Sequence, residues 1–154
     1  MRRWLTLRQH VTNVHASRSD APFVIGLDTN VLVRLLTADE PVQLKAASRL
    51  LAAHDGEPGA FFVNDMVLVE LVWVLGRLYG FGRNETLSAV KSLLDSDAFA
   101  FEDRERLGLA ITLCDTQPRD FADAMISLKN TVAGCETTAS FDKAMRGLPG
   151  VQLI

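Results

Sequence analysis

Four carboxylate side chains occupy positions from which this chain could bind a metal ion. They are Asp28, Glu70, Asp123 and Asp142. The first and last follow short segments typical of strands, and the other two lie in segments typical of helices. Carboxylates gathered at one edge of a sheet repel one another unless a cation neutralises them. Oxygen ligands favour Mg²⁺ or Mn²⁺, so the pattern indicates metal-assisted hydrolysis of phosphodiester bonds.

Strand-like and helix-like segments alternate from residue 23 to the end of the chain. The expected strands are 23–27, 60–63, 98–101, 136–140 and 151–153. The expected helices are 30–36, 42–54, 66–79, 84–94, 102–113 and 120–132, with a helical turn at 142–145. The alternation predicts an α/β fold with three layers, α/β/α, around a mostly parallel central sheet of four to five strands. Ligands of such folds gather outside the carboxyl ends of the strands, where we expect Asp28 and Asp142.

Length and charge narrow the possible functions. The chain has 154 residues, of which 48% are hydrophobic, and this suits one domain with a real core. The formal net charge is −3, and residues 1–22 alone carry +3 from four arginines and one aspartate, which leaves −6 for the remainder. This negative charge would repel a polyanionic substrate, unless several of the acids bind metal or a basic partner covers them.

Several classes of site are excluded by residue type and spacing. The two cysteines and three histidines show neither a disulfide framework nor zinc-ligand spacing, and we expect a reducing cytoplasm. The chain carries no Walker-type phosphate loop or Ser-His-Asp arrangement.

The longest apolar stretch of the chain is too short to cross a bilayer, so no membrane partner is expected. Residues 1–22 lack the apolar core of a secretory signal and are interpreted as an N-terminal extension, flexible or not native, before a domain at 23–154.

The acids at the ends of the strands have a second interpretation as helix caps. Asp28 could be an ordinary N-cap, although Thr29 or Asn30 could cap the helix instead and leave Asp28 free. Asn30 could also orient a neighbouring carboxylate. Asp142 could likewise be a cap or turn residue. Ser140 could orient a water, a phosphate or Asp142, or it could simply end the strand.

Glu70 is the one charged residue between positions 66 and 75. The helix around it is apolar nearly all round, which predicts deep burial. A buried carboxylate must reach a cation, a hydrogen-bond donor or water, and we favour a metal. The alternatives are a salt bridge to Arg34 or Arg77, or a polar stripe facing solvent. The alternating charges at the start of helix 102–113, in contrast, are expected to be solvated.

Asp120 and Asp123 are three residues apart and therefore share one helix face. Asp120 follows Pro118 and Arg119 and fits an N-cap better than a metal ligand. Asp123 lies one turn further along and is the better ligand. An acid near the positive end of a helix is also electrostatically stable without a metal.

In order and spacing, four segments together resemble the PIN-domain family, and most closely its VapC-type toxin endoribonucleases of type II toxin–antitoxin systems. The segments are LDTNVLVRLL, VLVELVWVL, DFADAMI and SFDKA. The resemblance covers residues 23–154. It implies that the acidic positions of the family are Asp28, Glu70, Asp123 and Asp142, with Thr29, Asn30 and Ser140 at its polar positions. It also implies RNA cleavage with Mg²⁺ or Mn²⁺, a small antitoxin protein with a basic arm, and a homodimer.

The expected mechanism uses Asp28, Asp123 and Asp142 to hold one or two metal ions. Glu70 would bind metal or orient the attacking water. The basic residues Arg34, Arg119 and Lys143 would contact the RNA backbone or form surface ion pairs.

Other functions remain compatible with the same four acids. One is a catalytically silent PIN-like binding module, and another is a structure-specific DNA nuclease. A phosphoacceptor receiver domain fits less well, because such a domain needs an acidic pair before the accepting aspartate.

Overall fold

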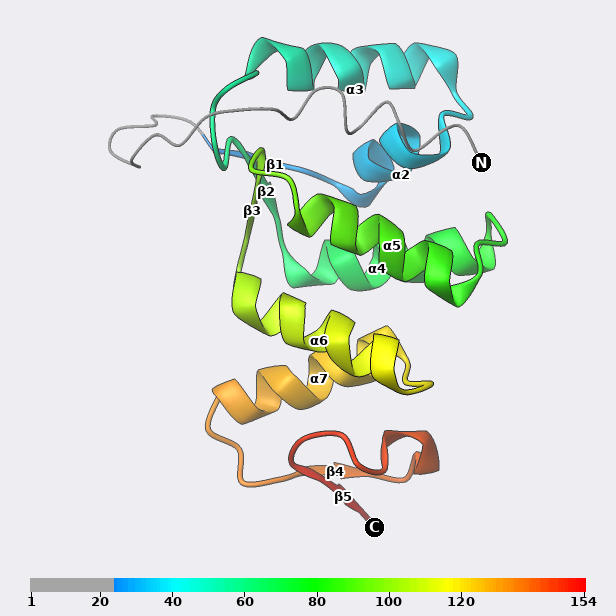
Figure 1. Cartoon of the computed structure of the whole chain (residues 1–154), viewed down its shortest axis with the longest axis vertical. Helices are drawn as coiled ribbons and strands as arrows, with labels where there is room; N and C mark the ends of the chain where they lie inside the picture. The colour runs from blue at the N-terminus through cyan, green and yellow to red at the C-terminus, as the bar shows by residue number, and fades with distance from the viewer. Residues whose placement is uncertain (1–23) are drawn as a thin grey trace.

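The computed structural model describes residues 24–154 (Figure 1). Its helices are α2 (Thr29–Thr37), α3 (Pro41–Ala53), α4 (Asp65–Arg77), α5 (Arg83–Leu94), α6 (Arg104–Thr116) and α7 (Phe121–Val132). Its strands are β1 (Ile25–Gly26), β2 (Phe61–Val63), β3 (Phe99–Phe101), β4 (Thr138–Ser140) and β5 (Val151–Leu153), with a 3-10 helix η1 at Lys143–Met145. The extension predicted at 1–22 lies outside the described residues. Within them, no helix is long and apolar enough to span a membrane.

The predicted alternation of strands and helices is confirmed, and local sequence explains where the helices begin. Asp28, Asn64, Asp103 and Asp120 each accept a backbone amide at the start of α2, α4, α6 and α7, respectively. Such caps satisfy amides that have no partner inside the helix. The cap interpretations of Asp28 and Asp120 are therefore correct.

The α/β class with parallel strands is confirmed, but the prediction of one sheet of four to five strands needs correction. The order β1-β2-β3 forms a parallel three-stranded sheet, and β4 and β5 form a separate parallel pair. Figure 1 shows α3 at one end of the molecule, followed by the three strands with α4 and α5. Helices α6 and α7 come next, and β4 and β5 lie at the far end. Because α6 and α7 lie between the two sheets, β4 does not reach the edge of β1.

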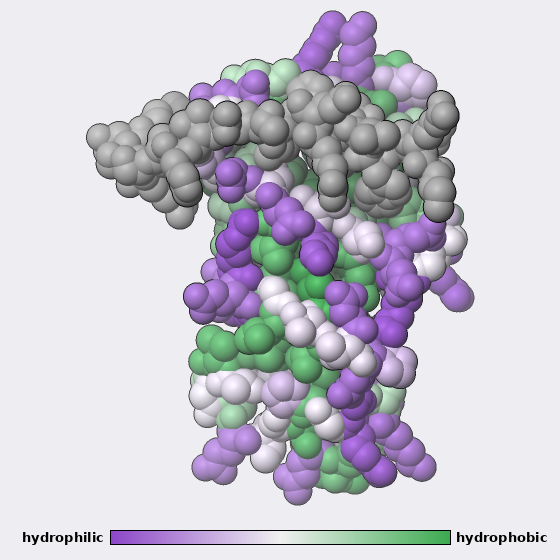
Figure 2. All heavy atoms as spheres, in the orientation of Figure 1, coloured by the Kyte–Doolittle hydropathy of each residue, from purple (hydrophilic) through white to green (hydrophobic). Residues whose placement is uncertain are grey.

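Helix α4 shows a second difference from the sequence prediction, because one of its faces is open. Its buried hydrophobic residues are Val67, Leu68, Leu71 and Leu75. Met66 and Trp73, however, have 78% and 59% of their surface exposed, and Glu70 is exposed as well. The prediction of burial all round is therefore wrong. Glu70 faces solvent, as the polar-stripe alternative had it, but the exposed residues beside it, Met66 and Trp73, are apolar. Figure 2 shows further hydrophobic side chains at the surface at the level of α6 and α7.

A buried ionic network, which the sequence did not reveal, ties α4 to α6 and α7. Asp65 is only 4% exposed, and its Oδ2 accepts hydrogen bonds from Arg106 at 2.5 Å and from Lys129 at 2.6 Å. Lys129 also donates to Glu102 at 3.0 Å. Arg106 is 8% exposed, so the solvated face expected at the start of this helix is wrong at that position. A buried charge requires such partners, and here they lie far away in sequence.

Candidate active site

The first acidic group consists of Asp28 and Glu70, with Thr29 between them. The carboxylate of Asp28 accepts hydrogen bonds from the backbone amide and the side-chain amide of Asn30, both at 3.3 Å. Thr29 is buried, and its hydroxyl donates to Glu70 Oε2 at 2.5 Å. Asn30 therefore orients Asp28, and Thr29 joins the first turn of α2 to the middle of α4.

The second acidic group consists of Asp120, Asp123 and Asp142. Asp120 Oδ1 accepts the Asp123 amide at 3.4 Å, in addition to that of Ala122 at 2.8 Å. Asp142 begins η1, and its own amide donates to Ser140 Oγ at 3.0 Å. Ser140 thus fixes the turn that presents Asp142, which is one of the roles considered for it from the sequence.

The negative charges of Asp120 and Asp142 act on the carboxylate of Asp123. Its pKa is raised, chiefly by burial and then by the negative charges of Asp120 and Asp142. Like charges and desolvation both disfavour the ionised form. A nearby cation would therefore stabilise the ionised form of the Asp123 carboxylate.

Asp123→Asn is expected to raise the melting temperature slightly at pH 7 in EDTA. A raised pKa means that the folded state binds the proton more tightly than the unfolded state, so ionisation destabilises the fold as pH rises. Asparagine removes this penalty. Thermal melts at pH 7 and below about pH 4, where the unfolded carboxyl is also protonated, should show the difference shrinking with acid. A variant less stable than the parent at pH 7 would contradict this.

Arg119 connects the segments on either side of the second acidic group. Its Nη1 donates to the carbonyl of Ala144 at 2.6 Å, and its other nitrogens donate to Gln117. It thereby joins the turn before α7 to η1, which carries Asp142. The two roles predicted for Arg119 were a contact with the RNA backbone or a surface ion pair. Its partners among the described residues are neutral oxygens, so its contacts show no ion pair, and the RNA contact stays a prediction.

Arginine 34 likewise has partners of its own, and Glu70 is not among them. Its Nη1 lies 2.9 Å from Asp39 and donates to Tyr79 Oη at 2.8 Å. The pKa of Asp39 is lowered to about 2, chiefly by the hydrogen bond from Tyr79 and then by those from Thr37 and Arg34. The Glu70–Arg34 salt bridge, one of the alternatives considered for Glu70, is therefore not formed, and Arg34 pairs with Asp39 instead.

The two acidic groups do not form one cluster in this structure. Their oxygen-only chemistry suits Mg²⁺ or Mn²⁺. Over residues 24–154, however, no three acidic, histidine or cysteine side chains gather closely enough to hold one ion. The convergence of all four acids at one sheet edge is thus not seen, because β4 pairs with β5 beyond α7 and not with β1.

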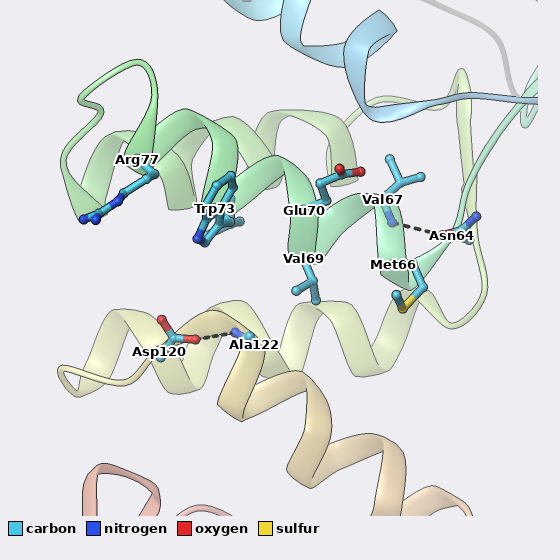
Figure 3. A pocket seen from close by; sticks show the side chains of 11 residues that line it. Asn64, Met66, Val67, Val69, Glu70, Trp73, Arg77, Asp120 and Ala122 are labelled. Carbon is cyan, nitrogen blue, oxygen red and sulfur yellow. Dashed lines mark hydrogen bonds between the residues drawn. The ribbon is translucent and has the colours of Figure 1, made fainter. Parts of the chain in front are cut away.

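A cavity of about 760 Å³ is lined by one acid from each group, Glu70 and Asp120. Its other lining residues are mostly apolar and include Met66, Val69 and Trp73. In Figure 3, Val69 and Glu70 point to opposite sides of α4, and Glu70 points toward α2. The cavity is therefore an apolar gap between acidic side chains.

The chain is similar in sequence to one family of known proteins. The family model described as "PIN domain" matches residues 25–150. A protein named "VapC ribonuclease" from Aquifex aeolicus (strain VF5) is 25% identical over 122 residues, covering 79% of this chain and 90% of that protein. The residues matched by the family model include both acidic groups.

Proposed function

Because this chain belongs to the PIN-domain family, we propose that it is a metal-dependent endoribonuclease and the toxin of a toxin–antitoxin pair. The observation that carries the proposal is the family match over residues 25–150, which contains Asp28, Glu70, Asp123 and Asp142. The similar protein from Aquifex aeolicus bears the name of a ribonuclease. The raised pKa of Asp123 supports a site that gains from a cation.

In the proposed site, Asp28, Asp123 and Asp142 would hold Mg²⁺ or Mn²⁺, and Glu70 would bind metal or position water. A bound divalent cation would lower the pKa of a water and stabilise charge on the phosphate. The hydroxyl of Thr29 donates a hydrogen bond to Glu70 and restrains its position. Groups that hydrogen-bond to the ligands of a metal commonly orient them in this way. Attack by water instead of the ribose 2′-hydroxyl leaves a 5′-phosphate and a 3′-hydroxyl.

The proposal requires the two acidic groups to come together, because its proposed ligands Asp28, Asp123 and Asp142 are divided between them. The first group supplies two carboxylates, Asp28 and Glu70, and the second supplies the remainder. As placed in this structure, the four residues do not fit a single ion. The proposed mechanism therefore includes a step that brings the first and the second acidic group together.

The proposed partners are RNA, a small antitoxin protein and a second copy of the chain. The charge of −6 outside residues 1–22 favours a basic partner. The cavity lined by Glu70, Asp120 and Trp73 offers such a partner an apolar surface with acids at hand. An antitoxin segment with basic and apolar side chains would satisfy both features.

The function is tested by incubating the purified chain with single-stranded RNA and with DNA of the same sequence. We expect RNA to be cleaved in Mg²⁺ or Mn²⁺, and EDTA to lower the rate at least ~100-fold, since bound metal contributes several kcal/mol. Analysis of the product ends would check for the 5′-phosphate. Preferential cleavage of DNA would support the DNA nuclease, and no cleavage of either would support the silent binding module.

A further inference from the structure

Asp142 lies in a turn that is fixed by contacts on both of the residues that follow Lys143. Its Oδ1 accepts the amide of Ala144 at 2.8 Å, which makes Asp142 the N-cap of η1. Met145 is only 5% exposed and anchors η1 in the hydrophobic core. The carbonyl of Ala144 accepts a hydrogen bond from Arg119 Nη1 at 2.6 Å. The residue whose amide holds the Asp142 carboxylate is therefore itself held by Arg119.

Arg119 is directed at this turn by its own neighbours. Gln117 Oε1 accepts from Arg119 Nη2 at 2.8 Å and from its Nε at 3.1 Å. The Gln117 carbonyl accepts the Arg119 amide at 2.7 Å and also a hydrogen bond from Arg83 at the start of α5. All three nitrogens of the guanidinium and its Nε edge are thus engaged by the protein, which fixes its direction.

Gly147 gives the guanidinium the space that it needs. The φ of Gly147 is +86°, which lies in the left-handed region that favours glycine. A Cβ built on Gly147 would come within 3.0 Å of Arg119 Nη2. The backbone after η1 therefore passes close to Arg119, and glycine permits both the turn and the close approach.

These contacts leave Arg119 poorly placed to bind a phosphate. Arginine recognises phosphate best through two parallel N–H bonds of its planar fork. A bidentate contact through the Nε–Nη2 edge of Arg119 would have to displace Gln117. Arg146, two residues beyond Ala144, is exposed and shows no side-chain hydrogen bond among residues 24–154. Arg146 therefore supplies a control of the same charge close to the same turn.

We propose that Arg119 is a positioning residue for Asp142, which acts through Ala144 and not through a contact with RNA. The inference rests on the proposed function, because it assigns Arg119 a role within the same site. Without the guanidinium, the Ala144 carbonyl loses its partner, and the turn that presents Asp142 opens more often. The Asp142 carboxylate then spends less time in the orientation that the reaction requires.

Steady-state kinetics separate positioning from substrate binding. Arg119→Met keeps the aliphatic stem but removes every donor, and Arg146→Met removes the same charge nearby. We expect kcat to fall ~10–100-fold in Arg119→Met with KM within about threefold of the parent, the size typical of groups that orient a reacting side chain. Arg146→Met should keep kcat within about twofold of the parent. A higher KM with an unchanged kcat in Arg119→Met would show an RNA contact and overturn the proposal.

Two further variants change the contacts of Arg119 in other ways. Gln117→Met removes the oxygen that directs the guanidinium but changes no charge, so we expect a smaller loss of kcat, about three- to tenfold. Arg119→Lys keeps the charge but cannot bond to Ala144 and Gln117 with the same geometry, so its kcat should lie between those of the parent and Arg119→Met. Full activity in both would show that only the positive charge matters, and it would overturn the proposal.

Hydrogen exchange gives a readout that needs neither RNA nor activity. The amide of Ala144 should exchange at least ~tenfold faster in Arg119→Met than in the parent or in Arg146→Met, because its hydrogen bond to Asp142 opens more often. The amide of Leu128 within α7 should keep its parent rate, which separates local opening of the turn from global destabilisation. An unchanged Ala144 rate in Arg119→Met would overturn the proposal. If Arg119→Met fails to fold, Gln117→Met carries the same test.

The outcomes distinguish a failure of this inference from a failure of the proposed function. A parent protein that cleaves no RNA overturns the proposed function, and the exchange rates still decide whether Arg119 fixes the turn. An active parent with no loss of kcat in Arg119→Met overturns only the positioning role.

Discussion

Asp28→Asn is expected to lower RNA cleavage at least ~1,000-fold, a loss of about 4 kcal/mol of transition-state stabilisation. The substitution removes the negative charge but keeps the shape of the side chain. Asparagine caps helices as well as aspartate does, so the bond to the Asn30 amide and the stability of α2 should be retained. Initial rates in Mg²⁺ and thermal melts of the same samples would measure both effects.

Asp97→Asn provides the matched control for this variant. Asp97 is also exposed, but it precedes β3 and therefore lies at the amino end of the sheet, away from Asp28. Its substitution should leave the cleavage rate within about twofold of the parent. An Asp28→Asn rate within tenfold of the parent would remove Asp28 from the chemistry.

Arg106→Met is expected to cost about 3–5 kcal/mol of unfolding free energy. The change leaves Asp65, 4% exposed, without one of its two cationic partners, and a buried charge that loses its partner is strongly destabilising. Because Lys129 still binds Asp65, the lower end of the range is expected. Urea unfolding of the parent and the variant would give the difference.

The neighbouring Arg104 supplies the control, because it lies in the same helix but is exposed. Arg104→Met should change the unfolding free energy by less than about 1 kcal/mol. A double variant, Asp65→Leu with Arg106→Met, should recover part of the loss, since it leaves no buried aspartate without its partner. A similar small cost for both arginines would show that the buried network contributes little.

Local signals in the sequence predicted the elements well. The strand expected at 151–153 is Val151–Leu153, and the helix expected at 84–94 is Arg83–Leu94. Periodicity and capping residues act over a few positions, so a single sequence contains them. The cap positions of Asp28 and Asp120 followed from the same local rules.

Long-range pairing could not be predicted in the same way. The alternating pattern placed β4 in one sheet with β1, but partner choice depends on how α6 and α7 pack between them. Arg106 looked solvated because its partner Asp65 lies 41 residues earlier in the chain. Glu70 looked buried because its neighbours in sequence are apolar, although the face of α4 that carries it is open.

Manganese binding tests most directly whether the two acidic groups form one metal site. Mn²⁺ would be titrated into the parent, Asp28→Asn and Asp142→Asn, and bound ion would be followed by electron paramagnetic resonance. We predict saturable binding to the parent and affinity at least ~tenfold weaker in both variants, because each removes a charged ligand of the same ion. Binding that is lost in one variant and unchanged in the other would contradict a shared site.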